Sequence, residues 1–366
     1  MEAMSNSFKI TPIGGLGQIG ANMLLIETDN ESTLVDCGIL FPKDDNFNID
    51  YLLPDYSVLP DNCEQIILTH GHEDHIGGIA HIKSMFPKIK LWCPHFCYEL
   101  INNKIGAKAN IFTEADCIKT KDLEIFPIQV NHSIPETFGL LINHYGKKKS
   151  LLYISDFKVS KNCTNEPAFI VQDIEKKIPK GFTRILMSDS TNATSKNLKT
   201  PDEDEVVPQF EKIFKEDHKR FFVTTFPSNI FRLNNIAKTA HKQGFKLYCY
   251  GLSMESYLSV LKNYKLKDNY ARHIQNLDKS SEIPKEKIVV LVSGCQAQLR
   301  STFRRIATGN DNFFTPEETD LFVISARSIP GNEANMALCL NGISEHGASI
   351  YTASDLMIHT SGHGGL

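Results

Sequence analysis

A run of six residues, 70–75, combines metal-binding side chains at very short spacing directly after an apolar stretch typical of a buried strand. Neutral imidazole and carboxylate groups are ligands that zinc prefers, and the end of a strand can aim alternate side chains into one cleft. His70 and His72 project from the same side of an extended segment. Asp74 and His75 begin the next turn and can reach a second ion close by. The spacing therefore predicts a site for two metal ions.

Three further candidates stand alone, each at the end of another predicted strand. They are Asp36 after 33–35, His132 after 123–130, and Asp156 after 151–155. Taken singly, a His or Asp at the end of a strand is more often a turn former or a satisfied polar group than a metal ligand. Strands of one sheet bring distant segments to a common edge, so the sequence predicts that these side chains converge on the cluster.

The order of these residues along the chain is informative. An Asp, the histidine-rich cluster, a His and another Asp follow one another, each after a strand, and this order resembles the metallo-β-lactamase superfamily. Segments 13–20, 130–135 and 155–158 narrow the resemblance to ribonuclease J, a bacterial and archaeal nuclease of the β-CASP type. Downstream, similar signatures occur at 188–192, 228–232, 329–333 and 359–363.

This resemblance implies a ligand set for two Zn²⁺ ions, with Mn²⁺ or Mg²⁺ as alternatives. The implied metal ligands are His70, His72, Asp74, His75, His132 and Asp156. One ion would be held by the histidines at positions 70, 72 and 132, the other by Asp74 and His75, and Asp156 would bridge them. Asp36 would orient a ligand from behind without touching the metal.

The resemblance also implies a reaction, the hydrolysis of RNA phosphodiester bonds by a metal-bridged hydroxide. Asp74, Asp189 and His363 would be catalytic, and His363 would contact the scissile phosphate or protonate the leaving 3′ oxygen. The implied RNA-binding residues are Ser228, Asn229, Arg232, Ser361, Gly362 and His363. The expected enzyme is a 5′-to-3′ exonuclease, an endonuclease or both, acting in RNA processing and decay and leaving 5′-phosphates.

Several departures from the family pattern keep other functions open. Phe231 stands where these enzymes usually carry His, 294–298 differs from the familiar stretch, and no Pro-x-His-Gly motif follows His363. The second metal site is therefore expected to be incomplete, either because the chain is truncated or because another chain supplies the ligand. The alternatives are a catalytically impaired RNA-binding or regulatory subunit and a small-molecule hydrolase of the same superfamily.

The periodicity of apolar residues predicts an α/β protein with two cores. Residues 1–197 consist mainly of short strands, which favours a metallo-β-lactamase αββα sandwich. From 198 to 355, strands alternate with helices, which indicates an inserted parallel α/β domain, the β-CASP domain of the family. Residues 356–366 would begin the return to the first domain.

A glycine-rich stretch at 15–20 has the spacing of a dinucleotide-binding loop. The residues that follow it, 22–27, have the pattern of a strand rather than of a phosphate-binding helix. We therefore expect these glycines to form a tight turn beside the metal cleft instead of a cofactor site.

Composition is consistent with a cytoplasmic enzyme and excludes a membrane protein. The 366 residues are 41% hydrophobic with a net charge of −4 and no long apolar run, and the nine cysteines are expected to be reduced. The acidic balance does not exclude nucleic acid, because counterion release depends on the phosphates contacted rather than on total charge. The expected partners are single-stranded RNA, further copies of the chain, and other RNA-decay proteins.

Overall fold

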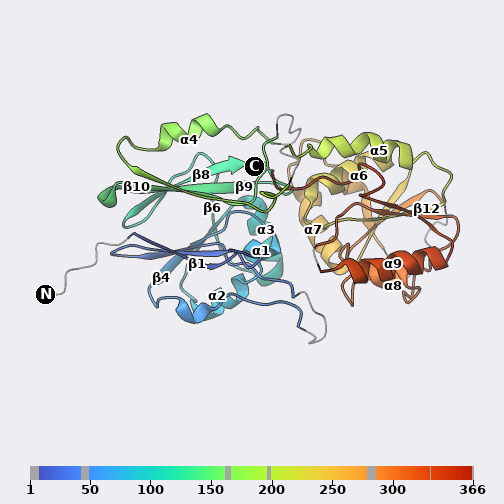
Figure 1. Ribbon diagram of the computed structural model, residues 1–366, viewed down its shortest axis with the longest axis horizontal. Coiled ribbons are helices and arrows are strands. Elements are labelled where there is room, and N and C mark those ends of the chain that lie inside the picture. The colour runs from blue at the N-terminus through green and yellow to red at the C-terminus, as the bar shows by residue number, and fades with distance from the viewer. Residues whose placement is uncertain are drawn as a thin grey trace.

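The computed structural model describes residues 8–42, 49–160, 166–195, 199–277, 286–329 and 331–364, and shows two halves side by side (Figure 1). The predicted domain boundary at 197–198 lies outside the described residues. So do residues 1–7, Pro330 of the 329–333 signature, and 365–366.

The first half contains two facing sheets. One has the order β1 (Lys9–Gly14), β2 (Met23–Glu27), β3 (Ser32–Val35), β4 (Cys63–Ile67), β5 (Lys90–Cys93) and β6 (Asn110–Ile111). The other has the order β11 (Thr183–Ser188), β10 (Lys149–Ile154), β9 (Thr137–His144), β8 (Leu123–Val130) and β7 (Ile118–Lys119). Apolar side chains of both sheets, among them Ile26, Val35, Leu140 and Ile142, form the core between them.

Helices cover the outer faces of this pair of sheets (Figure 1). The short α1 (Glu73–Ile76), α2 (Ile79–Met85) and α3 (His95–Ile105) lie on the side of the first sheet, and α4 (Val171–Lys177) lies over the second. Ile174 of α4 packs with Val130 and Leu141 of the second sheet. The layers are therefore helix, sheet, sheet and helix, as predicted, and the α/β class is confirmed.

The second half is built on a parallel sheet. Its order is β14 (Ile274–Asn276), β13 (Lys246–Tyr250), β15 (Ile288–Val292), β12 (Arg220–Thr224), β16 (Asp320–Ile324) and β17 (Ser349–Thr352). The helices are α5 (Val207–Ile213), α6 (Ile230–Lys242), α7 (Leu252–Asn263), α8 (Thr302–Ala307) and α9 (Glu333–Glu345). Side chains of α5, α6 and α7 pack in one core and those of α8 and α9 in another. The predicted alternation of strands and helices thus forms parallel βαβ units.

Single-turn 3₁₀ helices occur between these elements. They are η2 (Tyr56–Val58), η3 (Tyr145–Lys147), η4 (Glu203–Val206) and η5 (Tyr270–His273). The acidic stretch after residue 201 begins η4, where Asp202 and Glu205 form a reciprocal cap before α5. The change from the second to the third sheet falls between β11 and β12. We propose that the boundary between the two domains lies in this interval. We also propose that the chain returns to the first domain after β17.

The two halves share a continuous buried cluster that includes Ile134 of the first half and Met254 of the second. Hydrogen bonds from the second half reach the loops of the first. The Tyr257 hydroxyl donates to the Gly71 carbonyl at 3.3 Å, and the Ile230 amide donates to the Ser133 carbonyl at 3.0 Å. The second half therefore supports the loops that carry the predicted metal ligands. Among the described residues, no helix is long and apolar enough to span a membrane.

Candidate metal centre

The predicted ligands follow the ends of strands, as the sequence indicated, but these strands belong to two facing sheets rather than to one. His70 follows β4, His132 follows β8 and Asp156 follows β10, whereas Asp74 and His75 lie in the single turn of α1. Since β4 belongs to one sheet and β8 and β10 to the other, the facing sheets bring these strand ends to one edge. The structure thus brings together side chains that are far apart in the sequence.

The first group of ligands consists of His70, His72, His132 and Asp156, whose candidate ligand atoms all lie within 4.8 Å of one another. The His132 Nε2 atom is 3.2 Å from His72 Nδ1. The Asp156 Oδ2 atom is 3.6 Å from His132 Nε2 and 3.8 Å from His70 Nε2. Three imidazoles and one carboxylate are a common ligand set for a tetrahedral divalent metal.

The second group consists of Asp74, His75 and Asp156. The His75 Nε2 atom is 3.4 Å from Asp156 Oδ1 and 3.7 Å from Asp74 Oδ2. Asp156 therefore presents one oxygen to each group, which is the arrangement of a bridging carboxylate.

Each buried histidine of the cluster has one ring nitrogen that points away from the other ligands, and this outer nitrogen contacts another protein group. His75 Nδ1 lies 2.8 Å from Asp36 Oδ2, and His132 Nδ1 donates to the Gly362 carbonyl at 2.8 Å. His70 Nδ1 lies 3.0 Å from the Thr69 hydroxyl, which itself donates to Asp36. Such contacts fix the orientation of each ring and point its inner nitrogen at the cluster, as expected for metal-ligating histidines.

The inner nitrogen of His70 identifies the cluster as a fit for a metal. Its Nε2 atom is buried and has no hydrogen-bond partner among the described residues. Burial and the neighbouring imidazoles lower the pKa of His70 well below its ordinary value, and the pKa of His132 falls for the same reasons. An unpaired buried base is costly unless a cation binds it. The donor set therefore fits a divalent metal.

The carboxylates add negative charge to this cluster. Burial alone would lower the pKa of His75, but Asp156, Asp74 and Asp36 outweigh it and hold that pKa well above its usual value. Burial would likewise raise the pKa of Asp156, yet His75 and His363 hold it well below its usual range. The site therefore favours bound positive charge, which a metal ion supplies.

His363 and Asp189 lie against the same bridging carboxylate. His363 Nδ1 is 2.7 Å from Asp189 Oδ2, and its Nε2 is 3.8 Å from Asp156 Oδ2. Asn192 and Thr200 donate hydrogen bonds to the His363 carbonyl at 2.9 and 2.8 Å. The structure thus brings both predicted catalytic residues to the metal groups, where His363 is also within ligating reach.

Ser361 and Gly362, two of the expected RNA contacts, precede His363 and lie close to the metal ligands. The Ser361 hydroxyl accepts a hydrogen bond from Asn192 at 3.1 Å and another from the His363 amide at 3.0 Å. A Cβ atom on Gly362 would come within 2.7 Å of the His132 ring. Glycine at 362 therefore lets the backbone approach closely enough for its carbonyl to hold His132.

The other expected RNA contacts need correction. Arg232 is fully buried and donates to Glu203, to the carbonyls of Ser325 and Thr360, and to His359 Nδ1. Burial and Arg232 lower the pKa of His359 to about 3, so its ring stays a neutral acceptor.

Asn229 is also buried, caps the start of α6 and donates to Glu203. Phe231 is 3% exposed and belongs to the core. Arg232 and Asn229 are therefore buried and hydrogen-bonded within the second half and its return segment, whereas Ser228 is half-buried.

Two side chains of the site, Thr69 and Asn22, were not predicted from the sequence. Thr69 connects Asp36 to His70, and the Asn22 amide nitrogen lies 3.0 Å from His75 Nε2. Thr69 lies directly before the histidine cluster, and Asn22 lies two residues after the last glycine of the 15–20 stretch. Neither residue type is a common zinc ligand, so type and spacing gave no signal.

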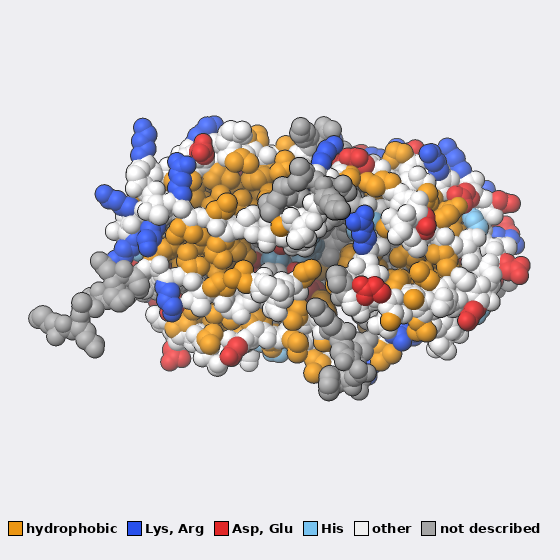
Figure 2. Space-filling model, in the orientation of Figure 1, with side chains coloured by type: hydrophobic (Ala, Val, Ile, Leu, Met, Phe, Trp, Pro, Cys, Tyr) orange, Lys and Arg blue, Asp and Glu red, His pale blue; other side chains and the backbone are white. Residues whose placement is uncertain are grey.

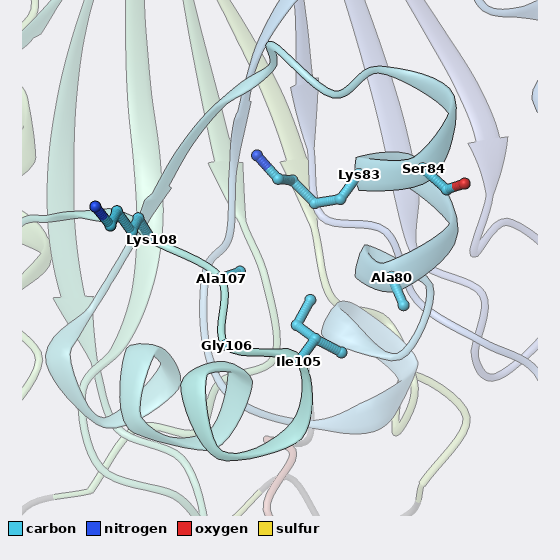
Figure 3. Close-up of a pocket in the computed structure, with 7 residues that line it drawn as sticks. All are labelled: Ala80, Lys83, Ser84, Ile105, Gly106, Ala107 and Lys108. Atoms are coloured by element: carbon cyan, nitrogen blue, oxygen red, sulfur yellow. The ribbon is translucent and has the colours of Figure 1, made fainter.

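The metal groups are distinct from a hollow on the surface. This hollow has a volume of about 530 Å³, and Figure 3 shows its lining between α2 and the end of α3, with Lys83 and Lys108 at its rim. None of the predicted ligands lines it. In Figure 2, histidine side chains are visible instead near the middle of the face, between the two halves.

Two family models match separate parts of the chain. Residues 16–116 match the metallo-β-lactamase superfamily, and residues 218–343 match the β-CASP domain of ribonuclease J. The first match contains 70–75, and the second covers most of the parallel sheet.

Curated relatives extend the similarity over nearly the whole chain. Ribonuclease J of Mycoplasma genitalium is 31% identical over 97% of this chain and 63% of its own length. Ribonuclease J 1 of Streptococcus pyogenes is 32% identical over 98% of this chain and 65% of its own. Ribonuclease J of Helicobacter pylori strain J99 is 32% identical over 98% of this chain and 52% of its own length. The chain thus spans about half to two thirds of the length of these relatives.

A solved structure supports the fold alone. A protein of unknown function from Enterococcus faecalis aligns with a TM-score of 0.64 and 14% identity, covering 98% of this chain and 88% of its own. The fold, the metal-type cluster and the two matches agree: the chain has a metallo-β-lactamase domain and a β-CASP domain of the ribonuclease J type, and it is similar to ribonucleases J over nearly its whole length.

Proposed function

We propose that this protein is a metal-dependent ribonuclease that hydrolyses phosphodiester bonds of single-stranded RNA, with zinc as its metal. The observation that carries the proposal is the position of Asp156, which faces both ligand groups and His363 at 3.4–3.8 Å. The names of the relatives supply the substrate class.

In this proposal the three histidines of the first group would hold one ion, Asp74 and His75 would hold the other, and Asp156 would serve as a ligand in both groups. When bound, such ions activate water as a nucleophile near neutral pH and offset the charge of the phosphate. Asp36 and Thr69 keep His75 and His70 in the ligating tautomer, and the Gly362 carbonyl does so for His132.

His363 completes the proposed reaction from the side of the second half. Asp189 holds its Nδ1, so its Nε2 faces the bridging carboxylate and the place where a phosphate would lie. There it can bind a phosphate oxygen or give a proton to the leaving 3′ oxygen. The products would carry 5′-phosphates. Both exonuclease and endonuclease action are compatible with these roles, and we place the enzyme in the cytoplasm, in association with further copies or with other RNA-decay proteins.

The two alternative functions fit the geometry less well. A small-molecule hydrolase has no need of a segment such as 359–363, which returns from the second half to the metal groups. A purely RNA-binding protein has no need of six clustered imidazole and carboxylate ligands, three of them histidines whose outer nitrogens are held by the protein.

The test is cleavage of single-stranded RNA, labelled in parallel at the 5′ end and internally, by protein loaded with Zn²⁺ or Mn²⁺. We expect Asp74→Ala and His363→Ala each to lower the rate by at least about tenfold, roughly 1.4 kcal/mol of barrier. His346→Ala, at the end of α9, is the matched control. Cleavage that persists after a chelator, or in both variants, would refute the proposal.

A further inference from the structure

Asn22 contacts the second ligand group at three atoms. Its amide nitrogen lies 3.0 Å from His75 Nε2, 3.3 Å from Asp74 Oδ2 and 3.1 Å from the Asp74 carbonyl. Two of these partners, the Asp74 carboxylate and the Asp74 carbonyl, can only accept a hydrogen bond. An N–H group of Asn22 therefore occupies the place where the second group collects negative charge.

We propose that Asn22 is a ligand of the second metal position, where its amide oxygen joins Asp74, His75 and Asp156. The inference rests on the metal dependence proposed above. The two ends of a carboxamide have the same shape, and rotation about the Cβ–Cγ bond exchanges them. Without a cation the N–H end faces the acceptors, and with a cation the oxygen end is favoured in the same place.

The separations around His75 Nε2 are those of ligands that share one ion. Its distances to the Asn22 amide, Asp156 Oδ1 and Asp74 Oδ2 are 3.0, 3.4 and 3.7 Å. Ligands about 2.1 Å from one ion lie roughly 3.0 Å apart in octahedral and 3.4 Å apart in tetrahedral geometry. Asn22 raises the number of available ligands in this group from three to four, the number that zinc most often takes.

The glycines of two loops make room for this contact. A Cβ atom on Gly15, which has a φ of +83°, would lie 2.5 Å from Asn22 Oδ1. A Cβ atom on Gly38 would lie 1.6 Å from the Asp74 carbonyl oxygen and 2.8 Å from the Asn22 nitrogen. The backbone of Asn22 is fixed as well, because its amide donates to the Asp74 carbonyl and its own carbonyl accepts from Gly38. The carboxamide is therefore anchored beside Asp74 and His75 from both sides.

The alternative is that Asn22 only donates hydrogen bonds to Asp74 and His75 and so positions them. Asn22→Asp separates the two roles. The carboxylate has the same shape and is a good metal ligand, but it cannot donate a hydrogen bond. Asn22→Ala removes both functions.

The experiment is a titration of the metal-free protein with Zn²⁺ in competition with a chromophoric chelator, together with elemental analysis. For the unchanged chain we expect two bound equivalents, the second weaker. Asn22→Ala should weaken the second by about tenfold or more and leave the first unchanged. Asn22→Asp should bind the second at least as tightly as the unchanged protein. Gln18→Glu adds a charge on the exposed part of the same loop and should change neither equivalent.

An unchanged second equivalent in Asn22→Ala would overturn the inference, and so would an Asn22→Asp variant as weak as Asn22→Ala. In both cases the first equivalent would still bind, and the proposed function would stand. If the unchanged chain bound no Zn²⁺ at all, the proposed metal dependence would fail and this inference with it. Thermal unfolding of the metal-free variants checks their folding, and Asn22→Asp decides the matter where Asn22→Ala is unfolded.

Discussion

His132 shows how a single side chain is fixed in one tautomer and one direction. It is 3% exposed, its Nδ1 is held by the Gly362 carbonyl, and its Nε2 faces His72 and Asp156. Burial lowers its pKa well below the ordinary value. The ring is therefore neutral before any metal binds, and little proton competition opposes binding.

We accordingly expect His132→Ala to lose the more tightly bound ion. The first group has the complete ligand set of a tetrahedral zinc site, whereas the second depends on fewer and weaker donors. After dialysis, elemental analysis should find about one equivalent in the unchanged protein and clearly less in the variant. His346→Ala should retain the metal. Retention of the tight equivalent by His132→Ala would show that this histidine is not a ligand.

A second prediction at this scale concerns Arg232 and the correction of its role. We expect Arg232→Met to lower the free energy of unfolding by about 3 kcal/mol, because among the described residues Glu203 would keep only Lys158, 3.9 Å away, as a cation partner. Urea unfolding measures this, and Arg232→Lys should lie between the two. If Arg232→Met weakened RNA binding while stability was unchanged, the RNA contact first expected for this residue would be correct.

At the scale of elements, the hairpin between β9 and β10 contains a lysine in a backbone conformation that favours glycine. Lys148 ends η3 with a φ of +49°, in the left-handed region, and its side chain is exposed. Lys148→Gly should raise the free energy of unfolding by about 0.5–1 kcal/mol, since glycine adopts this region without strain. Lys148→Ala removes the same charge but keeps the Cβ atom, so thermal unfolding should show no such gain. If Lys148→Gly and Lys148→Ala stabilised the protein equally, the gain would come from the loss of the lysine charge.

Elements were predictable from the sequence where local pattern decides them. The alternation of β8, the buried run of β15 and the glycine turn before β2 each depend on neighbouring residues. The histidine cluster was recognisable because its members are adjacent.

Other features depend on partners that the local sequence does not reveal. Arg232 is buried only because Glu203, 29 residues earlier, pairs with it. Asn22 reaches Asp74 across 52 residues. Such contacts follow from the packing of the sheets, and no local pattern could predict them.

At the scale of the whole molecule, a buried carboxyl makes stability depend on pH. Burial raises the pKa of Glu166 from its ordinary 4.5 to about 8, and its Oε1 accepts a hydrogen bond from the Glu136 amide. The folded state thus holds a proton that the unfolded chain releases above about pH 4.5. The stabilisation is complete below that pH and is lost as pH rises towards about 8.

We expect Glu166→Gln to remove this dependence, because the amide stays neutral at every pH. Relative to the unchanged protein, the variant should gain on the order of 4 kcal/mol between pH 5 and pH 9, measured by urea unfolding. Glu175→Gln, which removes an exposed carboxylate on α4, should shift stability equally at both pH values. If the free energies of unfolding of Glu166→Gln and of the unchanged protein changed with pH in the same way, a group other than Glu166 would be responsible for the pH dependence.

The hydrogen bonds between the halves end on the loops that carry ligands. Tyr257 binds the carbonyl of Gly71, between His70 and His72, and the Ile230 amide binds the carbonyl of Ser133, next to His132. A ligand that moves the halves apart must break these bonds and release the loops, so its binding and metal binding carry a coupling free energy. Thermodynamic reciprocity then requires that the metal change the affinity for that ligand by the same factor by which the ligand changes the affinity for the metal.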